Sequence, residues 1–157
     1  MIVYHGSTIE VCKPDIVHSR KSVDFGPGFY VTPLYDQAAN WCNRFRKIVS
    51  APVLSTYDLN DAVFEETKSL VFKDYSEEWL DFVLNCRRRE DNTDYDIVMG
   101  GIANDKVFNT IELFFNGRIG KEEALGRLKY EKANAQICLR TQTTIDKYLR
   151  FIGSKSL

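Results

Sequence analysis

Three short segments of the sequence place polar side chains beside a glycine or a strand end, where the backbone can come close to a ligand. They are residues 4–7 (Tyr-His-Gly-Ser), residues 24–32 (Asp-Phe-Gly-Pro-Gly-Phe-Tyr-Val-Thr) and residues 134–138 (Asn-Ala-Gln-Ile-Cys). Each segment alone is weak evidence for a binding site, because a lone histidine at a strand end usually has a structural role and Gly-Pro-Gly is usually a turn. They form a site only if the fold brings them together.

Taken together and in this order, the segments resemble the ADP-ribosyltransferase superfamily of the diphtheria-toxin and poly-ADP-ribose-polymerase type. That superfamily has His-Gly on its first strand, Gly-x-Gly-(Ile/Phe)-Tyr on its second, and Glu or a substitute at the start of a later strand. The corresponding residues here are His5, Tyr30 and Gln136. The resemblance covers residues 2–48 and 130–141. The part between them, including residues 95–108, resembles only a narrower bacterial group known as DUF3990.

The resemblance implies that the protein binds NAD as a co-substrate, without a metal. The backbone of Gly6 would hydrogen-bond the nicotinamide carboxamide, which offers one donor group and one acceptor, and Ser7 would help to hold it. Tyr30 and Trp41 would lie against the two faces of the nicotinamide ring. The role of Trp41 is assigned because residues 38–41 (Ala-Ala-Asn-Trp) match a family segment that ends in a stacking aromatic residue.

The resemblance also assigns the sugar contacts. His5 would hydrogen-bond a hydroxyl of the adenosine ribose. Arg20 is a candidate for the diphosphate or the adenine side, because a guanidinium suits phosphate oxygens, and a solvated surface charge is an equal alternative. In many family members a Glu stands at the position of Gln136, where it accepts a hydrogen bond from the nicotinamide ribose and favours the developing sugar cation. A glutamine accepts the same bond without the charge.

The expected activity is therefore transfer of a single ADP-ribose unit, or hydrolysis of NAD, rather than polymer formation. The acceptor, a protein or a nucleic acid, is not identified by the sequence. A general base would come from Asp24, Asp96 or Asp105, although a cap, turn or surface role is more common for each of these acids. Small bacterial domains of this kind are often toxins, so the resemblance also implies an antitoxin partner.

Two other functions remain open at this stage. The chain could be a non-catalytic module that binds NAD or an ADP-ribosyl group, which the missing glutamate favours. The likeness could also be one of fold alone, with a pocket for another nucleotide, since a fold does not determine a function.

Composition narrows the class of protein. The net charge of -1 provides no general attraction for nucleic acid, and the main basic run is residues 87–89, at the expected end of a helix. The four cysteines contain no CxxC pair, so we expect reduced thiols without a metal or a disulfide. The absence of an 18-residue apolar run or a signal peptide leads us to expect a cytoplasmic protein with no membrane partner.

The pattern of apolar residues predicts short strands alternating with helices in a single domain of residues 1–157. Expected strands are residues 2–5, 28–32, 53–59, 95–99 and 136–140, with an edge strand at 150–152. Expected helices run from Pro33 to about residue 47 and over residues 76–88, 105–115, 121–129 and 141–149, with a long loop over residues 11–27. The expected fold class is α+β. The resemblance implies an ADP-ribosyltransferase-like fold, with short antiparallel or mixed strands in a split central sheet surrounded by helices.

Overall fold

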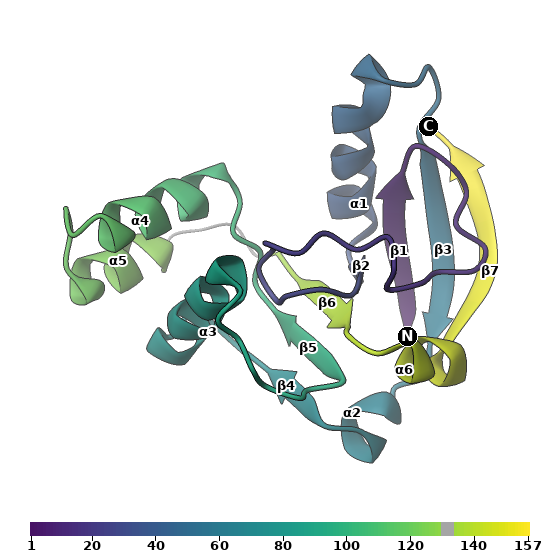
Figure 1. Cartoon of the computed structure of the whole chain (residues 1–157). Helices are drawn as coiled ribbons and strands as arrows, with labels where there is room; N and C mark the ends of the chain where they lie inside the picture. Colours follow the sequence, from purple (N-terminus) through teal and green to yellow (C-terminus); the bar gives the residue numbers. More distant parts are fainter. Residues whose placement is uncertain (130–133) are drawn as a thin grey trace.

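The computed structural model describes residues 1–129 and 134–157, which form an α+β structure with two small sheets and six α-helices (Figure 1). The first sheet has the order β1-β3-β7 and is antiparallel, with β1 (Ile2–Ser7), β3 (Val53–Leu59) and β7 (Leu149–Ser156). The second is mixed, with the order β2-β6-β5-β4, and contains β2 (Phe29–Val31), β6 (Gln136–Leu139), β5 (Ile97–Gly100) and β4 (Ser69–Val71).

The helices are α1 (Tyr35–Cys42), α2 (Val63–Glu66), α3 (Glu77–Arg88), α4 (Asp105–Phe115), α5 (Lys121–Leu128) and α6 (Gln142–Tyr148), with a 3-10 helix η1 (Asn43–Lys47) directly after α1. Helix α1 lies along β1, whereas α3, α4 and α5 lie on the side of the second sheet (Figure 1). No helix among the described residues is both long enough and apolar enough to span a membrane.

One antiparallel bridge joins the two sheets where β1 passes the end of β2. The amide of Tyr4 donates to the carbonyl of Thr32 at 2.8 Å, and the amide of Thr32 donates to the carbonyl of Tyr4 at 2.9 Å. Among the described residues β1 and β2 form no further backbone pair. Backbone pairing between the two sheets is therefore limited, among the described residues, to this one point.

Alternation along the strands of the second sheet gives it two buried faces. Phe29 and Val31 of β2 lie in a cluster with Val3 and Tyr57 of the first sheet. Tyr30, between them in the sequence, packs on the opposite side in a cluster that also contains apolar residues of α3 and α4, namely Trp79, Leu80, Val83, Cys86, Val107 and Ile111. The second sheet is thus buried between the first sheet and these helices.

Polar side chains begin the two longest helices. Ser76 accepts a hydrogen bond from the amide of Trp79 at 3.1 Å, which confirms the expected start of α3. Asn104 accepts from the amides of Lys106 and Val107 and so begins α4. The N-terminal starts of α3 and α4 are therefore determined by the local sequence.

The long loop between β1 and β2 also matches its prediction, because residues 8–28 contain no helix or strand. Its first half is tied to the first sheet by Val11, whose amide donates to Ser55 Oγ at 3.1 Å and whose carbonyl accepts from Tyr57 Oη at 2.6 Å. Gln142 of α6 bonds the backbone of Ile16 and Pro14. The loop thus crosses in front of β1 and β3 on fixed anchors (Figure 1).

Four elements differ from the sequence prediction. The helix after Pro33 ends at Cys42 and continues only as η1. Helix α2 and strand β4 were not expected, because segments of four and three residues are too short for a periodic pattern. Strand β7 extends to Ser156, well beyond the expected residue 152, because its polar end pairs with β3 as far as Val53. Pairing with a neighbouring strand overrides the weak strand preference of that end.

Candidate functional site

The free edge of β1 at Gly6 is the first component of the candidate site. Backbone groups of a strand point alternately to its two edges, and those of Tyr4 point toward Thr32. The amide and the carbonyl of Gly6, two residues on, therefore point to the same edge, away from β3. Neither bonds a residue in the described part of the chain. Gly6 thus presents one donor and one acceptor side by side.

Helix α1 packs directly on Gly6. A Cβ atom at this position would lie 2.7 Å from Cys42 Sγ, 3.0 Å from the carbonyl oxygen of Ala38 and 3.4 Å from Cδ1 of Trp41. The absent side chain is therefore what lets the helix approach the strand. Trp41 keeps 39% of its surface exposed and carries the guanidinium of Arg44 over its ring, 4.2 Å from the centroid. A partly exposed indole thus lies next to the free backbone groups of Gly6.

Ser7 ends β1 directly beyond Gly6 and is half-buried. Its hydroxyl has no hydrogen-bond partner among the residues that the structure describes, so it adds a further polar group to the same stretch of strand.

His5 is held in a single orientation and tautomer. Its ring lies 4.6 Å from the ring of Phe29, between centroids, and its Nδ1 lies 2.7 Å from the carbonyl oxygen of Tyr30. A carbonyl only accepts, so Nδ1 carries the proton. Burial lowers the pKa of His5 from its ordinary value of 6.5, and the bond to Tyr30 offsets only part of this. The ring is therefore neutral at pH 7, and Nε2 is an acceptor.

Tyr30 uses its hydroxyl within the protein. Oη donates to the carbonyl of Gly26 at 2.7 Å and accepts from the amide of Phe25 at 3.0 Å. Burial raises the pKa of Tyr30 well above its ordinary value, so the hydroxyl keeps the proton that it donates. Gly26 has φ +74°, a backbone conformation that favours glycine. Tyr30 thus holds the turn that carries Asp24 to its buried position.

Gln136 begins β6 and contacts Asp24, 112 residues away in the sequence. Its Nε2 lies 2.9 Å from Asp24 Oδ2 and 3.5 Å from the carbonyl oxygen of Gly101. Asp24 is only 9% exposed. Its Oδ2 also accepts from the amide of Ala103 at 3.0 Å, and its Oδ1 accepts from Arg87 at 3.0 Å (Nε) and 2.6 Å (Nη2). Asp24 therefore connects β6, α3 and the segment that precedes α4.

Unpartnered acceptor atoms on His5 and Gln136 reach solvent. Neither His5 Nε2 nor Gln136 Oε1 bonds any residue in the described ranges 1–129 and 134–157. Every buried side-chain nitrogen or oxygen in those ranges has a partner, so these two atoms are not buried. Both can therefore accept a hydrogen bond from a ligand.

Gln37 of α1 fixes the start of β6 and was missed by the sequence analysis. Its Nε2 donates to the carbonyl of Ala135 at 2.7 Å, and its Oε1 accepts from the amide of Ala135 at 3.1 Å. Trp41 lies four residues further along the same helix and so on the same face. The helix that carries Trp41 is thus tied to the residue before Gln136. No local sequence signal marks this link.

The fold connects most of the predicted site residues. The predicted residues of β1, α1, β2 and β6 are linked by the contacts above, whereas Arg20 is exposed and bonds no residue that the structure describes. Of the proposed general bases, Asp24 has both oxygens engaged, and Asp96 accepts from the amide of Lys68 and the hydroxyl of Thr141. The side chain of Asp105 lies outside the described residues.

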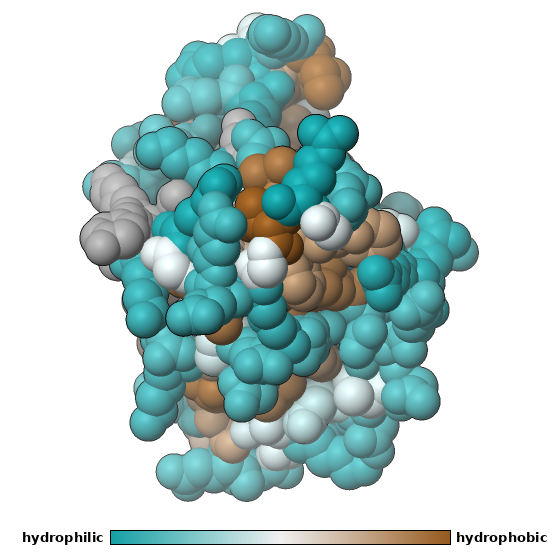
Figure 2. All heavy atoms as spheres, turned by 90° about the vertical axis from the view of Figure 1, so that its left-hand side faces the viewer, coloured by the Kyte–Doolittle hydropathy of each residue, from teal (hydrophilic) through white to brown (hydrophobic). Residues whose placement is uncertain are grey.

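The arginine run 87–89 does not form one basic patch. Arg87 binds Asp24 and lies over the ring of Phe108, Arg88 lies over the ring of Phe115, and Arg89 donates to Ser22 Oγ. Viewed from the side of α4 and α5, the surface shows apolar side chains gathered in a patch framed by hydrophilic ones (Figure 2). The arginines of α3 thus pack on the exposed aromatic residues of α4.

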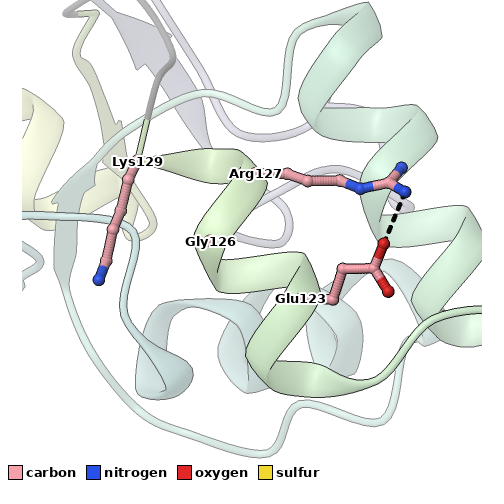
Figure 3. Close-up of a pocket in the computed structure, with 4 residues that line it drawn as sticks. All are labelled: Glu123, Gly126, Arg127 and Lys129. Carbon is pink, nitrogen blue, oxygen red and sulfur yellow. Dashed lines mark hydrogen bonds and ion pairs between the residues drawn. The ribbon is translucent and has the colours of Figure 1, made fainter.

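Two surface hollows lie away from these groups. One is lined by Glu123, Gly126, Arg127 and Lys129, where Arg127 pairs with Glu123 along α5 and Lys129 points away from both (Figure 3). The other lies at residues 58–61 and 146–150, with the N-terminal residue. Neither contains a residue of the predicted site.

Comparison with known proteins assigns the chain to a family. The model of the family described as "Protein of unknown function (DUF3990)" matches residues 1–151. The chain belongs to the DUF3990 family. Searches of curated proteins and of solved structures found no match.

The DUF3990 match covers both sheets except for the last residues of β7, as well as all of the contacts of the candidate site. The resemblance to the bacterial group that the motifs indicated is therefore confirmed at the level of the family. The roles of individual site residues stay predictions. The contacts described above add Arg87 and Gln37 to the site and give Asp24 a position that depends on distant residues.

Proposed function

We propose that this DUF3990 protein is an NAD-dependent mono-ADP-ribosyltransferase that uses the β1 edge and the start of β6. The observation that carries the proposal is the set of unpartnered polar groups on these strands. They are the donor and acceptor of Gly6, the acceptor His5 Nε2 and the acceptor Gln136 Oε1. A carboxamide offers the complement of the first pair, and sugar hydroxyls donate to the other two atoms.

The neighbouring aromatic residue fits a flat ring. Trp41 adjoins Gly6 and is partly exposed, so its indole can cover a nicotinamide whose carboxamide bonds the strand edge. Tyr30 has its hydroxyl engaged in the turn, so only its ring is left to contact a ligand. Arg20 is exposed and has no internal partner among the described residues, so its guanidinium is available to a phosphate group.

In the proposed reaction the bond between the nicotinamide nitrogen and the ribose C1′ breaks, and neutral nicotinamide leaves with the bonding electrons. The acceptor then bonds to C1′ and loses its proton; with water as the acceptor the product is free ADP-ribose. Gln136 holds a hydroxyl of the reacting ribose and points the negative end of its amide dipole at the developing cation. Gly6 and Trp41 orient the ring as it leaves, which lowers the entropic part of the barrier.

The experiment that tests the proposal is incubation of the purified protein with NAD and measurement of nicotinamide release. Mass spectrometry of a lysate incubated with the protein and NAD would then identify the acceptor by its ADP-ribose adduct. His5→Asn keeps a donor for the carbonyl of Tyr30 but removes the acceptor Nε2, so we expect at least about a tenfold loss of kcat/KM. His18→Asn is the matched control, because the exposed side chain of His18 bonds Asp15 and no other residue in the described part of the chain.

A second candidate function is a non-catalytic module that binds NAD or ADP-ribose. The observation that favours it is that, among the residues the structure describes, the carboxylate beside Gln136 is that of Asp24, which is paired with Arg87. Calorimetry distinguishes the two functions. Binding of NAD without nicotinamide release under any acceptor condition would support the module and contradict the enzyme.

That the protein is a toxin with an antitoxin partner is a separate proposal, and it rests on the resemblance alone. Expression of the protein in bacterial cells tests it, because an active transferase of cellular targets should arrest growth and the Gln136→Ala variant should not. Growth at the normal rate with active protein would contradict the toxin role.

A further inference from the structure

The contact between Asp24 and Gln136 leaves only one orientation for the glutamine amide. An ionised carboxylate only accepts hydrogen bonds, and so does the carbonyl of Gly101, the second group near Gln136. Both contacts must therefore be made by Nε2. The oxygen Oε1 is turned away from Asp24 and toward solvent.

Asp24 is itself fixed by groups that are independent of Gln136. Arg87 binds Oδ1 through two nitrogens, and the amide of Ala103 binds Oδ2. The turn at residues 24–28 is held in addition by the hydroxyl of Tyr30. The carboxylate thus forms a rigid support, with one lone-pair direction left for the glutamine.

We infer that Asp24 is the positioning residue of the site and acts through Gln136. It orients the amide so that Oε1 faces the ligand, and its negative charge polarises the amide so that Oε1 becomes a stronger acceptor. The effect on turnover rests on the proposed function, whereas the orientation of the amide does not. This role replaces that of a general base, because both carboxylate oxygens of Asp24 are already engaged.

The same contact explains why a glutamine stands where a glutamate is expected. A carboxylate at position 136 would face Asp24 at hydrogen-bond distance, and two carboxylates that close cannot both ionise. The amide at position 136 therefore suits the acid at position 24, and an acid at 136 would need a donor at 24, such as the amide of an asparagine. The exchange is not symmetric, because an amide nitrogen at 24 would lose the bond that Oδ2 accepts from Ala103.

The experiment compares Gln136→Glu, Asp24→Asn and the double variant Asp24→Asn/Gln136→Glu, with Gln136→Met as the matched control. Thermal unfolding is measured without NAD at pH 5 and pH 8. In Gln136→Glu the shared proton raises one carboxyl pKa in the folded state, so stability falls as pH rises. We expect its Tm, relative to wild type, to drop by about 5 °C more at pH 8 than at pH 5.

The controls separate charge conflict from the loss of one hydrogen bond. Gln136→Met lacks the bond but adds no charge, so its loss of Tm should be the same at both pH values. In the double variant the amide introduced at position 24 donates to the carboxylate introduced at position 136 and accepts from Arg87, but its nitrogen no longer accepts from the amide of Ala103, so only part of the pH 8 loss should be recovered. Equal stability of Gln136→Glu at both pH values, or no recovery in the double variant, would overturn the inference.

Nicotinamide release provides the second readout. We expect Asp24→Asn to lower kcat at least about tenfold with little change in KM for NAD, because a misoriented amide weakens contact mainly in the transition state. The double variant should regain the wild-type kcat or exceed it. If the pattern of stability holds while wild-type protein releases no nicotinamide, the orientation by Asp24 stands and the proposed enzyme function fails. A kcat unchanged in an active Asp24→Asn protein would overturn the positioning role.

Discussion

Single residues of the site differ in how much of their hydrogen-bonding capacity the fold already uses. The hydroxyl of Tyr30 makes two bonds inside the protein, and the oxygens of Asp24 take four donors. His5 and Gln136 each use a donor nitrogen, Nδ1 and Nε2 respectively, to fix the orientation of the side chain. Each keeps an acceptor atom that bonds no described residue. This half-used state, rather than residue type, distinguishes the groups proposed to bind a ligand from those that support them.

The lowered pKa of His5 gives a prediction about stability and pH. Burial makes the folded state resist protonation, while the unfolded chain takes up a proton near pH 6.5. The stabilising contribution of neutral His5 is therefore complete above pH 6.5 and is lost as pH falls below it. His5→Asn cannot titrate, so its free energy of unfolding should fall less than that of wild type between pH 7 and pH 5.

Urea denaturation at several pH values measures this effect. His18→Asn serves as the control, because its exposed ring forms only a local contact with Asp15. A wild-type stability that changes with pH in the same way as that of His5→Asn would show that His5 protonates freely in the folded protein.

At the scale of elements, the sequence predicted what local patterns encode. The apolar runs gave β1, β2, β3, β5 and β6 within a few residues, and Ser76 gave the start of α3. Short α2 and β4 and the polar end of β7 exist because neighbouring elements support them, and no local pattern reveals that. The same holds for the site: the motifs named Gln136, but its contact with Asp24 spans 112 residues.

Packing of α1 on β1 gives a prediction at this scale. Gly6→Ala would place a Cβ 2.7 Å from Cys42 Sγ and 3.0 Å from the backbone oxygen of Ala38, so the helix must shift. Overpacking of this kind costs about 1–3 kcal/mol. We expect the variant to lose that much free energy of unfolding and to lose affinity for NAD, because the shift moves Trp41 from the strand edge.

A double-mutant cycle with Cys42→Ala tests the cause. Removing the sulfur relieves the closest contact, so Gly6→Ala should cost less in the Cys42→Ala background than alone, with a coupling of about 1 kcal/mol. Chemical denaturation measures all four proteins. Strict additivity of the two changes would mean that α1 does not press on Gly6.

At the scale of the whole molecule, the site lies where two sheets that share one core separate. The cluster between the sheets contains Val3 and Tyr57 from one and Phe29, Val31 and Ile137 from the other. The bridge of Tyr4 to Thr32 joins the sheets, and just beyond it the β1 edge at Gly6 pairs with no residue that the structure describes. A shared core therefore holds both walls of the candidate site in a fixed relation.

Shared packing predicts that the two sheets unfold in a single transition. The two tryptophans provide local probes, since Trp41 lies against β1 and Trp79 is buried between the second sheet and α3. In Trp41→Phe the remaining fluorescence reports the second sheet, while far-UV circular dichroism reports both. We expect the two urea midpoints to coincide within error.

A fluorescence midpoint clearly apart from the dichroism midpoint would mean that the sheets are separate folding units. The walls of the site could then move apart without unfolding, and NAD binding should bring the two midpoints together by linking both units.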